Sequence, residues 1–347
     1  MKKKYFAVIP GSFCPPTTGH LSIVKEASEI FDKVNIVCSR NSYKKDYWFS
    51  QEECAAMWQS MDLPKNANVY TFDEIKKRFS LPFKDFIVIR GIRDIKNMHE
   101  EKRSLLISLE EFGVDKFFFI FGKEKHKDIS SAKLRYMAEY MDLIGMKEKT
   151  SPLVISYLLE KALNIKKLFI VSGKTGSGKT RIINELSKKH PVEYIDVDEL
   201  VRELHPIVKE HFNADDVLSL VKSRPDEVAD FLEIPLIEKI QEKLINLKKS
   251  GRLDKDTILM IECAYGLKYK IFKYLGGRIL YIDSSELKKR IIERKTPQHM
   301  EFINKIPGLN KSKKICSSNK LNLIVFNNDE EIEEGKIEEL YLELKGQ

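Results

Sequence analysis

Eight consecutive residues near the middle of the chain have the composition of a loop that binds phosphates. The segment from Gly173 to Thr180 reads GKTGSGKT and follows the apolar run LFIVS. In a loop of this spacing the backbone N–H groups surround a phosphate, the lysine neutralises two phosphates, and the last hydroxyl ligates Mg²⁺. We therefore expect a nucleoside triphosphate, ATP or GTP, to bind here with Mg²⁺. The expected ligands are Gly173, Thr175, Gly176, Ser177, Gly178, Lys179 and Thr180, with Thr180 on the metal.

A second loop rich in small residues follows the first apolar run of the chain. It reads PGSFCPPTTGH from Pro10 to His20 and leads into LSIVKEASEIF, whose apolar residues recur at helical spacing. The free N–H groups at the start of a helix attract phosphates, so this loop is a candidate anion site. The same residues also suit an ordinary turn between strand and helix, in which His20 caps the helix.

A carboxylate and an arginine follow another apolar run. The run VEYID ends at Asp196, Asp198 comes next, and Arg202 lies one helical turn later. A carboxylate that faces a phosphate-binding loop can act as general base for an acceptor hydroxyl, and a nearby arginine can hold the acceptor's anionic group. The alternative for Asp198 is the N-cap of the helix ELVREL.

These loops need rigid elements to position them, and the chain has two series of strand-like apolar runs. The runs lack alternation with polar residues and are separated by helical patterns, which is typical of parallel sheets covered on both faces. They comprise 5–9, 34–38, 68–72, 86–89 and 116–121 in the first series, and 168–172, 192–196, 258–262, 278–282 and 323–326 in the second. The predicted fold class is therefore α/β, with two doubly wound parallel-sheet domains at 1–164 and 165–347.

Composition restricts the class of protein. The length of 347 residues favours two domains, and 42% apolar residues suffice for ordinary cores. No apolar run approaches the ~20 residues of a membrane span, so we expect a cytoplasmic protein without a membrane partner. Five cysteines without metal-ligand spacing indicate free or buried thiols. The net charge of +8 is modest and no basic stripe with interleaved aromatics occurs, so we expect anionic small molecules rather than nucleic acid.

The first half resembles the nucleotidylyltransferase superfamily, and phosphopantetheine adenylyltransferase in particular. The segment PGSFCPPTTGH matches that family's PGTFDPxTxGH, Ile89 to Arg93 matches IRGxR, and Ile129 to Ala132 matches an ISSS-type motif. The chain departs from the family at Cys14, where an Asp is usual, and at Ala132, which replaces the third Ser. Glu100 stands where the family has Tyr.

The resemblance implies adenylyl transfer from ATP to 4'-phosphopantetheine, which gives dephospho-coenzyme A and pyrophosphate with help from Mg²⁺. It assigns stabilisation of the α-phosphate to His20 and Ser12, and the bridging of acceptor and ATP to Lys44 and Arg90. The remaining nucleotide contacts that it implies are Gly11, Phe13, Gly19, Gly91, Arg93, Glu101, Ser130 and Ser131.

The second half resembles dephospho-coenzyme A kinase, within the nucleoside monophosphate kinase plan. Asp198 and Arg202 match the DADxxxR element, which implies that Asp198 is the general base and Arg202 a substrate ligand. Arg290 and Arg294 match the spacing of a lid that contacts the ATP phosphates. The chain diverges from this family at the strand end from Cys263 to Tyr265, at Lys295 after the lid arginine, and at Lys313 or Lys314, where the lid has further arginines.

The order of the two halves favours a bifunctional enzyme, because the product of the first reaction is the substrate of the second. The expected partners are ATP, phosphopantetheine and dephospho-coenzyme A, and the sequence does not indicate an oligomeric state. One alternative is nicotinamide mononucleotide adenylyltransferase fused to ribosylnicotinamide kinase. Another is an adenylyltransferase whose degenerate second domain senses nucleotides.

Overall fold

The computed structural model describes most of the chain. The described residues are 6–40, 46–79, 85–92, 105–106, 109–110, 113–123, 126, 128–174, 176–263, 270–284, 322–328 and 334–346. Several residues to which the sequence assigns a role lie outside these ranges, namely Lys44, Arg93, Glu101, Thr175, Arg290 and Arg294.

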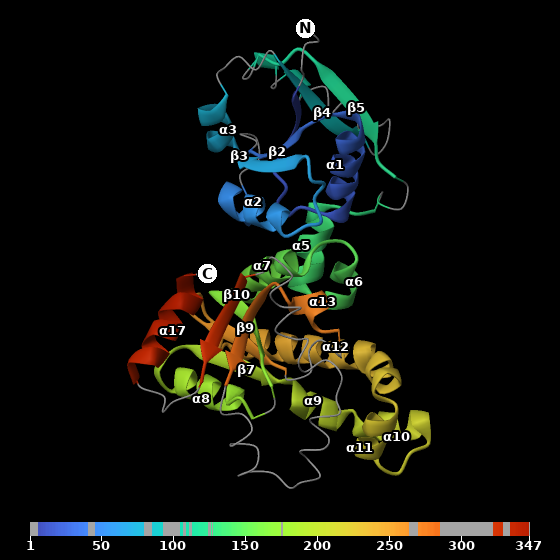
Figure 1. The fold of residues 1–347 in the computed structure, drawn as a ribbon, viewed down its shortest axis with the longest axis vertical. Helices are drawn as coiled ribbons and strands as arrows, with labels where there is room; N and C mark the ends of the chain where they lie inside the picture. The colour runs from blue at the N-terminus through green and yellow to red at the C-terminus, as the bar shows by residue number, and fades with distance from the viewer. Residues whose placement is uncertain are drawn as a thin grey trace. The chain divides into compact units, whose positions relative to one another are not determined.

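The chain forms two compact units, each with one five-stranded sheet (Figure 1). The first unit comprises Met1–Tyr136 and Glu148–Val154, and the second comprises Met137–Lys147 and Ile155–Gln347. Each unit therefore consists of two separate segments of the chain. A single domain boundary at residue 164 stays a prediction.

The first unit contains the parallel sheet expected from the first series of apolar runs. Its strands are β1 (Phe6–Gly11), β2 (Val34–Cys38), β3 (Ala67–Thr71), β4 (Phe86–Ile92) and β5 (Phe117–Phe121), in the order β3-β2-β1-β4-β5. The helices α1 (Thr18–Ile30), α2 (Gln51–Gln59), α3 (Phe72–Arg78) and the first turns of α5 (Ser131–Glu139) accompany it.

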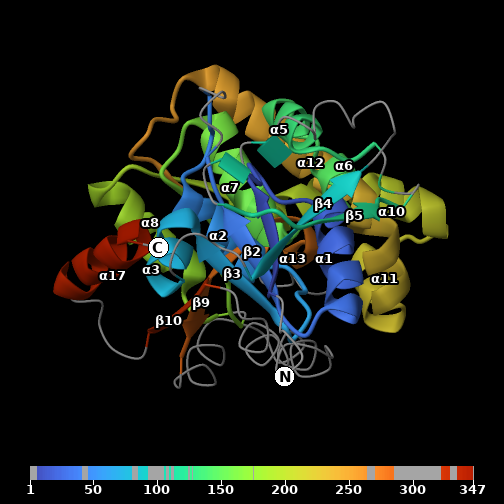
Figure 2. The ribbon, with the colours of Figure 1, turned by 90° about the horizontal axis from the view of Figure 1, so that it is seen from above.

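Opposite faces of the first sheet are covered by different helices. On β4, Val88 packs in a core cluster with Ile75 of α3, whereas Gly91 approaches Ile23 of α1. Because side chains alternate between the two faces of a strand, α1 and α3 lie on opposite faces (Figure 2). This confirms the prediction of a sheet covered on both sides.

The second unit repeats this plan with a second parallel sheet. Its strands are β6 (Lys167–Ser172), β7 (Val192–Asp196), β8 (Ile258–Glu262), β9 (Arg278–Asp283) and β10 (Asn322–Asn327), in the order β10-β9-β6-β8-β7. Its helices are α6 (Leu143–Lys147), most of α7 (Pro152–Leu163), α8 (Lys179–Lys189), α9 (Val197–Glu203), α10 (His205–Phe212), α11 (Val217–Ser223), α12 (Pro225–Ser250), α13 (Phe272–Leu275) and α17 (Glu334–Gly346). The predicted α/β class is confirmed for both units.

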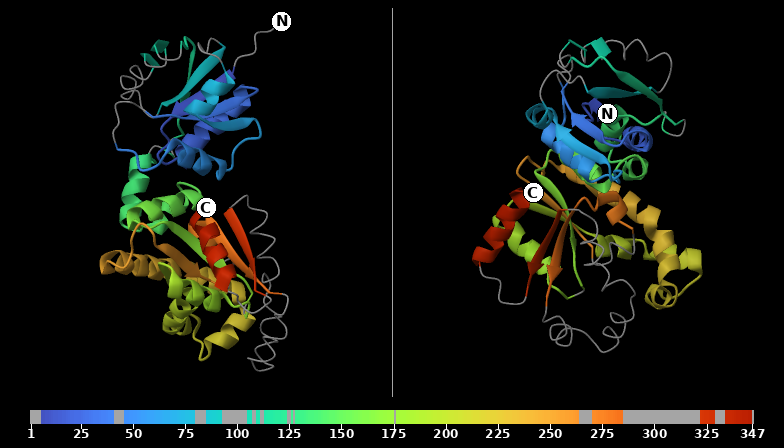
Figure 3. Two further views of the ribbon diagram at one scale, coloured as in Figure 1. Left: turned by 90° about the vertical axis from the view of Figure 1, so that its left-hand side faces the viewer. Right: turned by 45° about the horizontal axis from the view of Figure 1, so that its top comes forward.

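Two contacts fasten helices to the second sheet. Apolar residues of α8 and α17, including Ile183 and Leu340, share one core cluster with β6, so these helices lie side by side (Figures 1 and 3). Elsewhere Glu160 of α7 forms a buried ion pair with Arg278, the first residue of β9, and also accepts a hydrogen bond from Leu168 N–H at 3.0 Å. The second contact fixes α7 against the amino end of the sheet.

Four cysteines are described, and all four are buried free thiols, as expected: Cys14, Cys38, Cys54 and Cys263. Within the described part of the chain, no helix combines the length and the apolar character that crossing a membrane requires.

Candidate active site

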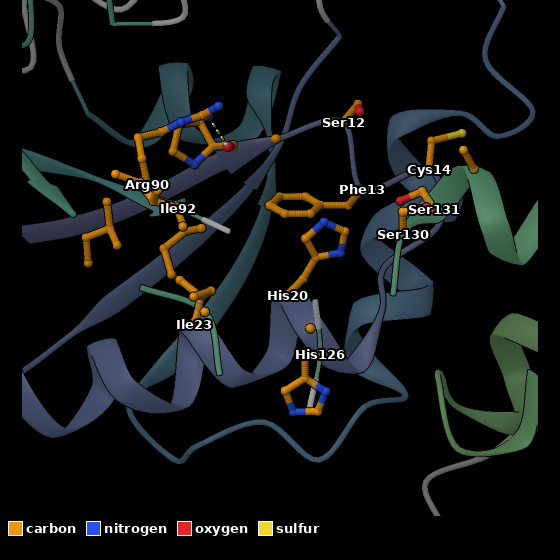
Figure 4. Close-up of a pocket in the computed structure, with 18 of the residues that line it drawn as sticks. Ser12, Phe13, Cys14, His20, Ile23, Arg90, Ile92, His126, Ser130 and Ser131 are labelled. Carbon is orange, nitrogen blue, oxygen red and sulfur yellow. Dashed lines mark hydrogen bonds between the residues drawn. The ribbon is translucent and has the colours of Figure 1, made fainter. Parts of the chain in front are cut away.

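A cavity of about 490 Å³ opens at the carboxyl ends of β1 and β4 in the first unit (Figure 4). The described residues that the family resemblance assigns to substrate binding or catalysis all line it: Gly11, Ser12, Phe13, Gly19, His20, Arg90, Gly91, Ser130 and Ser131. The strand order explains this convergence. The chain runs from β1 to β2 on one side and from β4 to β5 on the other, so β1 and β4 form the switch point where open α/β sheets bind ligands.

His20 lies on the cavity wall in the first turn of α1. Thr17 is the N-cap of α1, and its Oγ1 accepts a hydrogen bond from the His20 backbone N–H at 3.2 Å. In return the Thr17 N–H donates to His20 Nδ1 at 3.1 Å. Nδ1 must therefore carry a lone pair, which leaves the proton of the neutral ring on Nε2. His20 both caps the helix and offers an N–H donor on its other ring nitrogen.

Phe13 holds this region of the loop in place. Its backbone has a positive φ of 41°, and its ring meets the His20 ring edge to face with centroids 5.2 Å apart. A Cβ atom on Gly11 would lie only 2.7 Å from the Phe13 ring. Gly11 is thus required because Phe13 covers the end of β1 and packs against His20.

Gly91 and Gly19, which also line the cavity, differ in what surrounds them. A Cβ on Gly91 would lie 2.9 Å from Ile23 Cγ1, so Gly91 allows α1 to approach β4 closely. Among the described residues, the atom nearest to a Cβ on Gly19 would be Thr17 Oγ1 at 3.5 Å. None of these described neighbours requires a glycine at position 19, and the missing side chain leaves room in the cavity beside His20.

The polar side chains around the cavity are held by backbone carbonyls and helix ends. Arg90 Nη1 donates to the Pro10 carbonyl at 3.1 Å. Ser131 Oγ donates to the Pro15 carbonyl at 2.7 Å, and Ser130 Oγ accepts from the Lys133 N–H at 3.1 Å. Ser130 therefore caps the start of α5, while Ser131 ties that start to the loop after β1.

Cys14 occupies the position where the resembled family has an aspartate. A hydrogen bond with the Cys54 thiol lowers the pKa of Cys14 to about 6, against the opposing effect of burial, and the backbone of Phe49 and Trp48 contributes in the same direction. At neutral pH Cys14 is therefore expected to be a thiolate. A thiolate at this position would carry the same sign of charge as the aspartate of the resembled family.

The second unit places the GKTGSGKT loop between β6 and α8, as the motif predicts. Gly173, Gly176 and Gly178 all have positive φ angles, of 148°, 85° and 91°. Lys179 is buried, and its Nζ donates to the Gly173 carbonyl at 3.2 Å and the Lys174 carbonyl at 3.3 Å. Two carbonyls at the beginning of the loop therefore accept hydrogen bonds from the lysine at its end, which is the first residue of α8.

Thr180 and Glu262 form a hydrogen-bonded pair of oxygen groups beside this loop. Thr180 Oγ1 donates to Glu262 Oε1 at 2.9 Å, and Glu262 is the last residue of β8, which neighbours β6. Burial raises the pKa of Glu262, and the negative charges of Asp196 and Asp198 act in the same direction, whereas Lys179 opposes them. A hydroxyl and a carboxylate are hard oxygen donors of the type that Mg²⁺ prefers. Among the described residues no group of three or more His, Cys, Asp or Glu side chains could hold a metal ion.

Asp198 and Arg202 lie on α9, at the carboxyl edge of β7. The N-cap of α9 is Asp196, whose Oδ1 accepts from the Asp198 N–H at 2.8 Å. The alternative that Asp198 caps this helix is therefore wrong. Asp198 is exposed, and Arg202 Nη2 lies 4.0 Å from Asp196 Oδ2. Both side chains are exposed to solvent. They follow β7, whose neighbour β8 ends at Glu262.

A match to a known protein family covers most of the first unit and the beginning of the second. Residues 8–177 match the family model described as cytidylyltransferase-like. The chain carries a cytidylyltransferase-like domain. This confirms the nucleotidyltransferase type predicted for the first half, whereas the match ends at residue 177 and does not test the kinase prediction for the second half.

Curated relatives of the cytidylyltransferase-like domain share modest identity. Phosphopantetheine adenylyltransferase of Carboxydothermus hydrogenoformans is 27% identical over 134 residues, which is 39% of this chain and 83% of that protein. The enzyme of the same name from Thermodesulfovibrio yellowstonii is 29% identical over 160 residues, 46% of this chain and 95% of that protein. Both matches span most of the relative and less than half of this chain.

Solved structures give weaker matches. A structure of NadR protein in complex with NR aligns over 100% of this chain and 96% of that chain, at 12% identity and a TM-score of 0.32. TT1252 from Thermus thermophilus aligns over 50% of this chain and 93% of that chain, at 18% identity and a TM-score of 0.36. Matches at these scores carry no argument about the site.

The cytidylyltransferase-like domain also contributes residues to which sequence reasoning assigns no role. Asp46, Tyr47, Lys123, His126 and Arg135 line the same cavity. Arg135 Nη1 donates to the Cys14 carbonyl, and its position four residues after Ser131 on α5 was a usable signal. The others lie in loops with no motif. In the second unit Glu262 was also missed, although an acidic residue that ends the apolar run ILMI is a recognisable signal.

Proposed function

We propose that the first unit transfers the adenylyl group of ATP to 4'-phosphopantetheine, giving dephospho-coenzyme A and pyrophosphate. One observation carries the proposal: the nucleotide-type loop, the capped His20 and Arg90 meet in one cavity at the switch point of the sheet. The similarity to phosphopantetheine adenylyltransferases over nearly their full length supports the choice of substrate.

The cavity suits an attack by one phosphate on another. The acceptor's phosphate oxygen would attack the α-phosphorus of ATP, so the protein needs to position two anions and to stabilise the added charge on the α-phosphate. The Nε2–H of His20, the Ser12 hydroxyl and the N-terminus of α1 supply donors for that charge. Arg90 is held at the cavity wall by a neutral carbonyl, and a phosphate would offer it a stronger, charge-assisted hydrogen bond.

Further residues complete this proposal, and three of them, Lys44, Arg93 and Glu101, lie outside the described ranges. We assign Lys44 with Arg90 to the bridge between acceptor and ATP, and Arg93 and Glu101 to nucleotide binding. Ser130 and Ser131, at the start of α5, would hold the β- and γ-phosphates. Gly11, Phe13, Gly19 and Gly91 would shape the nucleotide site.

For the second unit we propose phosphorylation of the ribose 3'-hydroxyl of dephospho-coenzyme A by ATP. The loop from Gly173 to Thr180 would hold the phosphates, with Lys179 on the β- and γ-phosphates. Asp198 would accept the proton of the acceptor hydroxyl and Arg202 would bind the acceptor's phosphate. Arg290 and Arg294 are proposed to close over the ATP phosphates.

Mg²⁺ fits the oxygen pair in the second unit. Thr180 Oγ1 and the carboxylate of Glu262 would hold it, because these two groups already lie within hydrogen-bond distance. When bound, Mg²⁺ would neutralise charge on the β- and γ-phosphates. The expected partners are then small phosphorylated molecules in the cytoplasm.

A coupled assay tests the proposal and its rivals. The full chain is incubated with MgATP and either phosphopantetheine or nicotinamide mononucleotide, while pyrophosphate release and product mass are followed. We expect turnover of phosphopantetheine, followed by a second product that is heavier by one phosphate. Turnover of nicotinamide mononucleotide alone would favour the fused pyridine-nucleotide enzyme instead.

The second step has its own test. The assay starts from dephospho-coenzyme A and compares the parent chain with Asp198→Asn and Lys179→Ala. We expect both variants to lose phosphorylation. No phosphorylation by the parent, together with nucleotide binding by the second unit, would support the nucleotide-sensing alternative.

A further inference from the structure

The phosphate-binding loop of the second unit is supported from behind by Asn328, the residue after β10. Asn328 has only 2% of its surface exposed. Its Nδ2 donates to the Ser177 carbonyl at 2.7 Å, and its backbone N–H donates to the Asp283 carbonyl at 2.8 Å. Asn328 therefore joins the end of β9 to the middle of the loop.

The hydrogen bond to Ser177 fixes the direction of a peptide group. The Ser177 carbonyl and the Gly178 N–H belong to the same planar peptide, in which these two groups point in opposite directions. Because Asn328 holds the carbonyl on the buried side, the Gly178 N–H is directed to the other side of the loop. Gly178 is the N-cap of α8, so this N–H lies at the helix start where phosphates bind.

The beginning of the loop is fixed against the same strand end. Gly173 has a φ of 148°, and a Cβ there would lie 2.3 Å from the Ile282 carbonyl oxygen. The loop is thus in contact with β9 at Gly173 and with the residue after β10 at Ser177. The first is a close approach to a backbone carbonyl and the second is a hydrogen bond from a side-chain amide, so the loop is positioned at two points.

Burial of the polar Asn328 side chain is unfavourable for stability, and packing alone does not explain why an amide occupies this position. Among the described residues its Oδ1 has no hydrogen-bond partner, and neither have the buried hydroxyls of Ser177 and Ser284 nearby. A buried polar group without a partner is unfavourable by about 1–3 kcal/mol, so an apolar residue would suit this position better for stability alone. The amide is explained by the donor that it supplies to the loop.

From these contacts we infer that Asn328 is a positioning residue, which orients the Ser177–Gly178 peptide so that its N–H can bind a nucleotide phosphate. The inference rests on the proposed nucleotide binding by this loop. Asn328 touches no phosphate itself and acts through the backbone of Ser177.

The test measures MgADP binding to the full chain by calorimetry, in the parent and in Asn328→Asp. At pH 8 the aspartate is an acceptor of the same shape and cannot donate to the Ser177 carbonyl. We expect affinity about tenfold weaker or more at the second-unit site, which corresponds to one hydrogen bond to a phosphate-binding group. Binding at that site is the part of the signal that Lys179→Ala removes. In the Lys179→Ala background, adding Asn328→Asp should not reduce MgADP binding any further.

A pH series separates orientation of the loop from general damage. In the Asn328→Asp variant a protonated carboxylic acid can donate through its hydroxyl, whereas the carboxylate cannot, so the deficit in affinity should shrink between pH 8 and pH 5.5. The matched control is Asn327→Asp, which changes the same charge at the exposed neighbouring position. We expect the control to bind as the parent does at every pH.

The outcomes are distinguishable. Absence of any Lys179-dependent binding in the parent would overturn the proposed function and, with it, this inference. Equal binding by the parent and Asn328→Asp, an equal loss in Asn327→Asp, or a loss that does not depend on pH would each overturn the role of Asn328 alone. If Asn328→Asp does not fold, Asn328→Ala replaces it, with an expected loss of about three- to tenfold that no pH change restores.

Discussion

At the scale of single residues, His20 combines a structural and a chemical task in one ring. Nδ1 accepts from the helix cap, and this leaves Nε2 as the donor. The capping-box geometry usually has Glu or Gln in this position, so the two tasks can be separated by substitution. At Glu262 the proposed role and stability conflict, because burial of the proposed Mg²⁺ ligand is unfavourable for a charged carboxylate.

His20→Gln is expected to abolish most of the adenylyl transfer while it keeps the fold. Glutamine can reach back to the Thr17 N–H as the histidine does, but it lacks the imidazole N–H. Loss of one donor to a developing charge lowers kcat by about 10²- to 10³-fold. The measurement is pyrophosphate release together with the melting temperature. A similar loss of stability in His20→Gln and His20→Ala would show that the cap was not preserved.

Glu262→Gln is expected to stabilise the second unit and to remove its Mg²⁺-dependent nucleotide binding. Burial raises the pKa of Glu262 in the folded state, so the charged form disfavours folding, and its unfavourable effect grows as pH rises through that raised pKa. Glutamine carries no charge and can still accept from Thr180.

Thermal unfolding at pH 5 and pH 8 checks this prediction. The gain in melting temperature of Glu262→Gln over the parent should be larger at pH 8. Glu199→Gln, at an exposed position on α9, is the control and should change little at either pH. A gain that is greater at pH 5 would contradict the assigned pKa direction.

At the scale of elements, the sequence predicts strands better than it predicts the contacts between elements. All ten apolar runs became strands, because buried parallel strands need continuous apolar residues, and that requirement is local. The reasons for Gly91 and Asn328 are contacts with residues distant in the chain, which no local pattern encodes. Asp196 rather than Asp198 caps α9 because both carboxylates are near the helix start, and only the backbone decides which one reaches the free N–H groups.

The ion pair between α7 and β9 gives a prediction at this scale. Arg278→Met should destabilise the second unit by about 3–5 kcal/mol, because it removes the guanidinium that forms an ion pair with the buried Glu160 carboxylate. Adding Glu160→Gln should restore part of that loss, since glutamine can still accept from the Leu168 N–H. Urea unfolding of both variants is the measurement. A double variant no more stable than Arg278→Met would contradict the explanation.

At the scale of the whole molecule, the sequence predicts two nucleotide-handling units, and the structure confirms two separate α/β sheets. Each sheet has its own loop at the carboxyl end of its first strand. The residues assigned to the two reactions do not overlap. The modest charge of +8 is consistent with sites for phosphorylated small molecules distributed over both units.

The two activities should therefore be separable by single substitutions in the full chain. His20→Gln should leave phosphorylation of added dephospho-coenzyme A within about twofold of the parent rate, and Lys179→Ala should do the same for adenylyl transfer. Both rates are measured on both variants, with each substrate supplied directly. Loss of both rates in either variant, with the fold intact, would show that the sites depend on one another.

The bond between Asn328 and Ser177 has a consequence for the time course of synthesis. The two residues are separated by 151 positions in the chain. At a synthesis rate of about 5–20 residues per second, Asn328 is added roughly 8–30 seconds after Ser177. During that interval the loop exists without its support, whereas the first sheet needs nothing beyond β5 to pair its strands. The strands of the first sheet are therefore all synthesised well before Asn328, which supports the loop from Gly173 to Thr180.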